Sequence, residues 1–354
     1  MGFDDENDAE SDGGEPSDTM RERASEHRVK LWLLLYANRW AVAAVPLLFV
    51  FGSLVVLGAI DPVPLQSVVA SSDPIETVFQ ALLTATITGV TLVVSINSLV
   101  LSQELGPLGD QRQRMSGAME FRRDVEDDLS VTAAPPEPSA FLRALVVAVS
   151  DRAEALGDAV SANDLSGEDE LGPRIDDYVA GLRGNASEVS DELEEGQFGT
   201  FDVLFAALDF NYSWKIYQAR RLRNEHEDLP DAVSEAFDEL VNVLTYFGPA
   251  REHFKTLYFQ WELINLSRAM MYAAVPSLVV STAAILYIDD PGTITGTVFG
   301  VGNVVWTVSA AVAVAVFPFT ILISFILRIA TAAKRTLSIG PFILRSENRS
   351  ENLD

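Results

Sequence analysis

The chain has no cysteine among its 354 residues, so disulfides, thiolate metal sites and cysteine nucleophiles are excluded. Catalytic motifs are also missing, because no GxGxxG, Walker or HExxH pattern occurs. The three histidines lie in different segments and lack the spacing of metal ligands. We therefore expect no enzyme, no cofactor and no bound metal.

Positive charge is scarce as well. The chain carries 51 Asp and Glu against 25 Lys and Arg, a formal net charge of −26. The only lysines are Lys30, Lys215, Lys255 and Lys334. Such a surface repels a phosphate backbone, so we expect no nucleic-acid partner. Dense carboxylates with few lysines resemble the proteins of extreme halophiles, in which salt screens the repulsion between acids. The excess is spread over the polar segments, and we favour a halophilic protein over an ordinary acidic one.

Four stretches are apolar over the roughly 20 residues that a membrane-spanning helix needs. We place the spans at residues 40–60, 77–103, 268–288 and 304–327. The links at 61–76 and 289–303 are short, whereas a long polar segment, 104–267, separates the second span from the third. The sequence therefore predicts an all-α, four-span integral membrane protein with a helical cytoplasmic bundle inserted between spans 2 and 3.

The orientation follows from the distribution of basic residues. Neither short link contains Lys or Arg, so placing both termini inside puts all 25 basic residues on the cytoplasmic side. This bias is what the positive-inside rule expects. We predict a multi-pass protein of the cell membrane with cytoplasmic termini. Its ends would be a disordered acidic tail at 1–20, a basic and aromatic juxtamembrane helix at 21–39, and a C-terminal tail at 328–354.

The polar segment 104–267 shows helical periodicity in several runs. Apolar residues recur at steps of three and four over 142–160 and over 175–193, in runs too short for a coiled coil. No Gly or Pro occurs from Ala250 to Val275, so two alternatives stay open for the last helix of this segment. It either continues unbroken into the third span or bends near residues 265–267.

A row of small residues runs along the second span at alternating steps of four and three. On a helix these residues share one narrow stripe. The stripe either lines a pore or forms a packing seam, because small residues allow helices to approach closely. We favour the seam. The hydroxyl stripe consists of Thr77, Thr84, Thr88, Thr91, Ser95, Ser98 and Ser102, with Ala81 in the same row.

A second candidate site is the basic cluster of Arg220, Arg221 and Arg223, which follows an aromatic-rich run. These arginines are candidate contacts for anionic lipid headgroups at the inner membrane face. An ion-pair surface within the bundle is the alternative, and we favour it.

The order of the parts is similar to that of bestrophin-type anion channels, in which the second span lines a pore formed by several subunits. None of that family's neck or calcium-clasp residues is found here, so no site is carried over. Two functions remain. The one that we favour is a non-enzymatic, membrane-anchored scaffold or sensor whose bundle binds cytoplasmic protein partners. The alternative is an oligomeric ion channel with the hydroxyl stripe lining its pore. Both lie in the lipid bilayer, and we expect a homo-oligomer.

Overall fold

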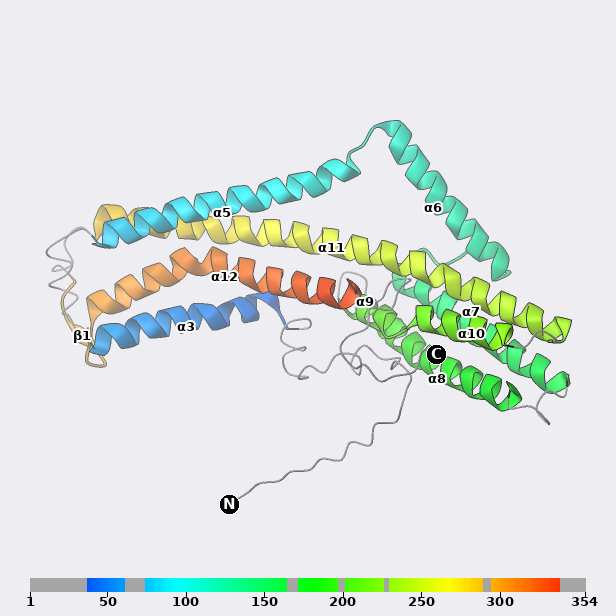
Figure 1. Ribbon diagram of the computed structural model, residues 1–354. Coiled ribbons are helices and arrows are strands. Elements are labelled where there is room, and N and C mark those ends of the chain that lie inside the picture. Colours follow the sequence, from blue (N-terminus) through cyan, green and yellow to red (C-terminus); the bar gives the residue numbers. More distant parts are fainter. Residues whose placement is uncertain are drawn as a thin grey trace, which may run out of the picture. The chain divides into compact units, whose positions relative to one another are not determined.

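The computed structural model describes residues 37–60, 74–163, 171–196, 201–225, 229–288 and 294–337. The described chain is nearly all helical, which confirms the all-α part of the predicted fold class (Figure 1). The predicted tail at 1–20 lies outside the described residues, as do most of the predicted juxtamembrane helix and the chain after residue 337. One short hairpin interrupts the helices, formed by β1 (Thr297–Val298) and β2 (Val301–Gly302).

The chain divides into two compact units. Asp124–Phe254 forms the main part of the first, which we call the bundle unit. His27–Arg123 and Lys255–Lys334 form the second, which we call the four-span unit.

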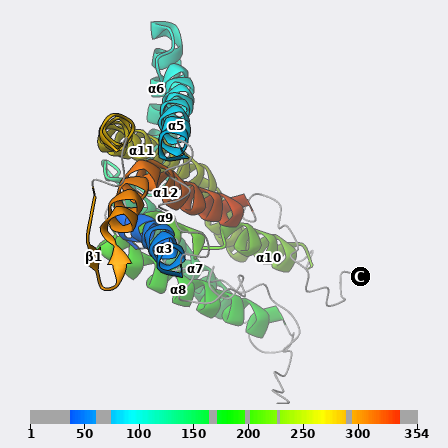
Figure 2. The same cartoon turned by 90° about the vertical axis from the view of Figure 1, so that its left-hand side faces the viewer.

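Four helices are long and apolar enough to cross a membrane, which indicates a membrane protein. They are α3 (Arg39–Ile60), α5 (Pro74–Glu104), α11 (Asp231–Tyr287) and α12 (Asn303–Leu337). In the four-span unit α12 lies between α3 and α5 (Figures 1 and 2). After α5 the chain breaks at Gly106-Pro107 and continues as α6 (Leu108–Asp128).

Helix α11 decides between the two alternatives for the third span. It runs without a break for 57 residues, through Gly248-Pro249 and Pro276. Residues up to Phe254 belong to the bundle unit and those from Lys255 to the four-span unit, so one helix contributes to both.

Helix α12 contains Pro318 and bends near its middle (Figure 1). A bend is expected there because proline lacks the N–H that would bond to the carbonyl four residues earlier. The hydroxyl of Ser277, in α11, donates to the Ala315 carbonyl just before the bend at 2.9 Å. The same hydroxyl lies 3.3 Å from that of Thr86, so a buried polar contact joins α5, α11 and α12 at this level.

The bundle unit is built mainly from amphipathic helices and the first part of α11. These helices are α7 (Pro138–Ala162), α8 (Leu171–Glu195), α9 (Phe201–Leu208) and α10 (Tyr212–Asn224). The apolar runs predicted over 142–160 and 175–193 are buried, and α7 packs along α8. The periodicity therefore identified the core faces of these two helices correctly.

Candidate functional site

The hydroxyl stripe lies on the side of α5 opposite the buried face of this helix. The buried residues of α5 are Ile75, Phe79, Thr86 and Val93, which share one face of the helix. At 3.6 residues per turn the stripe falls on the opposite face, and every residue in it is exposed. Within the described chain, the stripe is therefore not a contact between spans.

The hydroxyls of the stripe bond to the backbone of their own helix. Those of Thr84, Thr88, Thr91 and Ser95 each donate to the carbonyl four residues earlier, at 2.8–2.9 Å. These bonds satisfy the hydroxyl donors without water, as hydroxyls in membrane helices commonly do. The side chain of Gln80, which lies beside the stripe, is also exposed.

An open groove of about 800 Å³ borders the stripe. Its α5 wall includes Thr77, Gln80, Thr84 and Thr88, and the wall from α12 is Phe319 and Leu322. The groove brings the hydroxyl face of α5 next to an apolar edge of α12, so both helices contribute to this face of the four-span unit.

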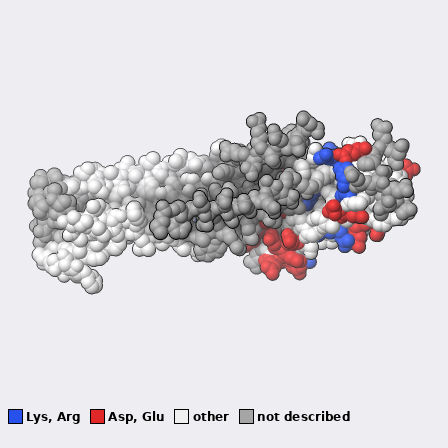
Figure 3. Space-filling view, turned by 60° about the horizontal axis from the view of Figure 1, so that its bottom comes forward, with Lys and Arg blue, Asp and Glu red and all other residues white. Residues whose placement is uncertain are grey.

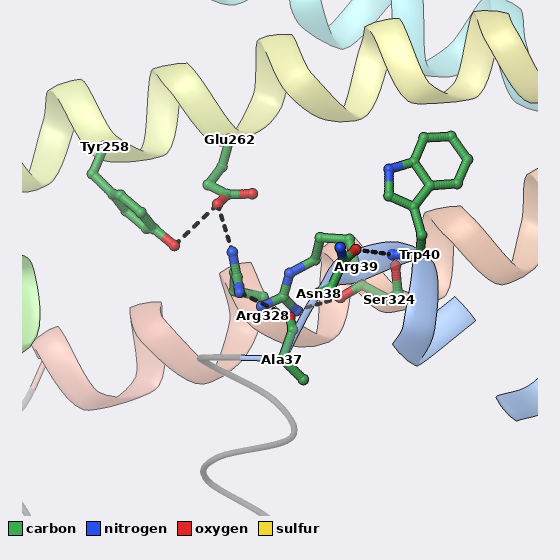
Figure 4. Close-up of polar contacts among 8 residues, drawn as sticks. All are labelled: Ala37, Asn38, Arg39, Trp40, Tyr258, Glu262, Ser324 and Arg328. Atoms are coloured by element: carbon green, nitrogen blue, oxygen red, sulfur yellow. Dashed lines mark hydrogen bonds and ion pairs between the residues drawn. The ribbon is translucent and has the colours of Figure 1, made fainter. Parts of the chain in front are cut away.

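A buried polar cluster, which the sequence did not reveal, joins α3, α11 and α12 (Figure 4). We call it the Glu262 cluster, and it consists of Arg39, Tyr258, Glu262 and Arg328. Oε1 of Glu262 accepts from Nη1 of Arg328 at 3.0 Å and from the Tyr258 hydroxyl at 3.2 Å. The Glu262 residue is only 4% exposed, so the ion pair is largely shielded from solvent.

The two arginines also tie α3 to α12 through backbone carbonyls. Arg39, the first residue of α3, donates to the Ser324 carbonyl of α12 at 3.4 Å. In return, Nη2 of Arg328 donates to the carbonyl of Ala37, just before α3, at 3.3 Å. The charge of Arg39 also interacts with that of Glu262. The cluster therefore holds the start of α3, the middle of α11 and the last third of α12 together.

Sequence patterns miss this cluster because its members are far apart along the chain. Arg39 and Arg328 flank predicted spans, where basic residues are usual, and Glu262 falls in the polar segment before the third span. The only available signal is that Tyr258 and Glu262 share a helix face at a spacing of four. That spacing does not identify partners on other helices.

The arginines at 220–223 lie on the exposed side of α10 in the bundle unit. Nε of Arg221 bonds to Glu225 at 2.7 Å, and Arg223 pairs with Asp238 of α11. Arg220 is exposed. Hydrogen bonds from Arg221 and then Arg174 lower the pKa of the Glu225 carboxyl below its usual value. Two of the three candidate headgroup contacts thus take part in ion pairs within the bundle.

Charged side chains gather over the bundle unit, whereas the visible surface of the spans carries none among the described residues (Figure 3). No group of three or more His, Asp or Glu residues in the described chain could hold a metal ion. Residues 5–354 match the profile of a protein family described as a family of unknown function, DUF7972. No curated protein and no solved structure matches the chain.

Proposed function

We propose that this chain, which belongs to the DUF7972 family, is a membrane-anchored scaffold or sensor that forms a homo-oligomer through the hydroxyl stripe of α5. The observation that carries the proposal is the position of the stripe, on the face of α5 opposite the residues that pack within the chain. A second copy can therefore reach it.

The stripe is well suited to a dry contact between helices. Small residues let two helix backbones approach closely, which is the main source of packing energy between helices in lipid. Because Thr84, Thr88, Thr91 and Ser95 already bond to their own helix, burying them against another copy leaves no hydroxyl donor unpaired. Assembly through α5 would bring several bundle units together and display them to protein partners.

We further propose that the protein lies in the cell membrane with both termini and the bundle unit in the cytoplasm. Support comes from the links between the paired spans, since residues 61–73 and 288–302 contain no Lys or Arg. Loops that stay on the cytoplasmic side of the membrane carry an excess of Lys and Arg, and loops that are translocated carry few. The bundle would then present its carboxylate-rich surface to cytoplasmic partners.

Single cysteines test the orientation, because the chain has none of its own. Ser71→Cys is expected to react with a membrane-impermeant maleimide added to intact cells. Ser187→Cys, at an exposed position on α8, is expected to react only after lysis. If Ser187→Cys alone were labelled in intact cells, the result would contradict the proposed orientation and indicate the opposite one.

An oligomeric ion channel is the second candidate, and the exposed amide of Gln80 favours it. An amide that faces lipid loses its hydrogen bonds with water, at a cost of about 2–7 kcal/mol when nothing replaces them. If α5 helices surrounded a wet axis, Gln80 and the hydroxyl stripe would instead face water, as polar pore linings do.

A pair of neighbouring positions separates the two candidates. Thr91 belongs to the stripe, whereas Leu92 lies off it and is 60% exposed. In a packing seam, Thr91→Cys should form disulfide-linked dimers on oxidation and resist a hydrophilic thiol reagent, because Cα atoms must come within about 7 Å to be bridged. In a pore, Thr91→Cys should react with the reagent, and the reaction should reduce ion flux in liposomes.

Leu92→Cys is the matched control, since it places the same thiol at nearly the same depth, about 100° around the helix from Thr91. The Leu92→Cys variant is expected neither to form disulfide-linked dimers nor to react with the hydrophilic thiol reagent. Equal behaviour of the two variants would contradict assembly through the stripe, whichever function is correct. We expect Thr91→Cys to cross-link and to remain protected from the reagent.

A further inference from the structure

The Glu262 cluster is incompletely paired, although it is buried. Oε2 of Glu262 and Nε of Arg328 have no hydrogen-bond partner among the described residues. A half-satisfied network of buried charges stabilises little, because desolvation of the charges offsets much of their attraction. In some proteins such networks specify one arrangement of the chain rather than add stability.

The arrangement that this cluster specifies involves three helices. Glu262 holds α11 to Arg328 of α12, and Arg328 also bonds to the carbonyl of Ala37, two residues before α3. Loss of the contact between Glu262 and Arg328 would therefore remove the polar link between α11 and α12 at this level, while Ser277 still joined them farther along α11 and Arg39 still joined α3 to Ser324. Within the cluster, one polar contact joins α11 to α12, between Glu262 and Arg328. Two others join α12 to the start of α3 or to the residues before it.

Helix α11 gives this contact a route to the bundle unit. Glu262 lies eight residues after Phe254, the last residue of the bundle part of α11, and the helix is unbroken between them. Eight residues span about 12 Å of helix. A twist or shift of the bundle part of α11 would reach Glu262 through the hydrogen bonds of this unbroken helix.

We propose that the Glu262 cluster is a latch, closed in this structure, whose release lets the adjoining part of α11 separate from α12. The latch goes beyond the proposed scaffold function, because it requires neither a second copy nor an ion pathway. It provides a way for a partner bound to the bundle unit to change the four-span unit.

Two buried alanines of α11 report on opening of the latch in the full-length, cysteine-free chain in detergent. Ala269 lies two turns after Glu262 on the same face and is 6% exposed. Ala284, 3% exposed, lies near the other end of the span. If the latch opens locally, N-ethylmaleimide should label Ala269→Cys at least about tenfold faster than Ala284→Cys. Equal rates would mean that the latch does not open, and would overturn the proposal.

The cluster is then weakened in the Ala269→Cys and Ala284→Cys backgrounds. Glu262→Gln should raise the labelling rate at Ala269→Cys by at least about another tenfold and leave Ala284→Cys unchanged, because only the latched end opens more often. Glu235→Gln is the matched control. It makes the same chemical change at an exposed position of α11 and should alter neither rate.

An equal rise at both reporters would show general loosening, and would overturn the latch in favour of a simple brace. If Glu262→Gln does not fold, Tyr258→Phe provides the same test, since it removes only the hydroxyl that donates to Glu262. It should raise labelling at Ala269→Cys alone, by about two- to fivefold. No rise there would equally overturn the proposal. The Thr91→Cys result is independent, so the failure of one proposal leaves the other standing.

Discussion

Lowering the salt concentration from about 1 M to about 0.1 M is expected to unfold the bundle unit while the four spans stay helical. The Debye length rises over this range from about 3 Å to about 10 Å, so exposed carboxylates begin to repel one another. The chain has 51 Asp and Glu against 25 basic residues, and the described charges gather over the bundle (Figure 3). The spans carry few charges and should be insensitive to this change.

The ion pairs of the bundle unit are not expected to prevent its unfolding at low salt. Those joining its helices include Arg143 with Glu194, Arg152 with Glu239 and Arg174 with Glu225. Their side chains are a third or more exposed, and exposed pairs typically contribute only about 0–1 kcal/mol each. The remaining carboxylates on the same surface add repulsion that such pairs do not offset.

The measurement is the helical signal of the full-length chain in detergent, followed by circular dichroism at decreasing salt. Neutralising three exposed acids of α8, by Glu188→Gln, Asp191→Asn and Glu195→Gln, should move the transition to lower salt. Glu194→Gln serves as a control, because it removes one negative charge but also the partner of Arg143. An unchanged signal across the whole range would contradict the halophilic interpretation.

Replacing Phe247 by alanine is expected to destabilise the bundle unit by about 3–5 kcal/mol, the usual cost of deleting a buried aromatic ring. The Phe247 side chain is fully buried. Its ring centroid lies 4.8 Å from that of Phe210 and 6.0 Å from that of Tyr212. Phe210 lies between α9 and α10 and Tyr212 is the first residue of α10, so one ring holds the start of α10 and the residues before it against α11.

The loss is measured as a lower urea midpoint of the bundle, followed by the fluorescence of Trp214 in a chain whose other tryptophans are replaced by phenylalanine. Val147→Ala is the control, because Val147 is 42% exposed on α7 and should change stability by less than about 0.5 kcal/mol. A cost below about 1 kcal/mol for Phe247→Ala would show that this ring does not anchor the core.

The local pattern of the sequence was sufficient to predict the secondary structure and the apolar faces. Length and hydropathy predicted four helices able to cross a membrane, and steps of three and four predicted the buried faces of α7 and α8. These features depend on residues close in the chain, whose spacing decides which side chains share a face.

Some features depended on the balance between local helix-breaking residues and packing, which a local sequence pattern does not show. Gly248-Pro249 and Pro276 are signals for breaks, yet α11 continues through them. Packing along both units outweighs a local penalty of a few kcal/mol for proline in a helix. The hairpin before α12 is a second example, since strands of two residues leave no periodicity to detect.

The sequence by itself determined that the hydroxyl stripe exists, that its residues share one face of α5, and that the chain contains four membrane-length helices. Only the tertiary structure decided that this face lies opposite the buried residues of α5, and that Arg39, Glu262 and Arg328 form one cluster. The physical reason is that helical periodicity defines which residues lie together on one helix. Which face meets which neighbour is set by the packing of whole helices, through contacts between residues as far apart as Ala37 and Arg328.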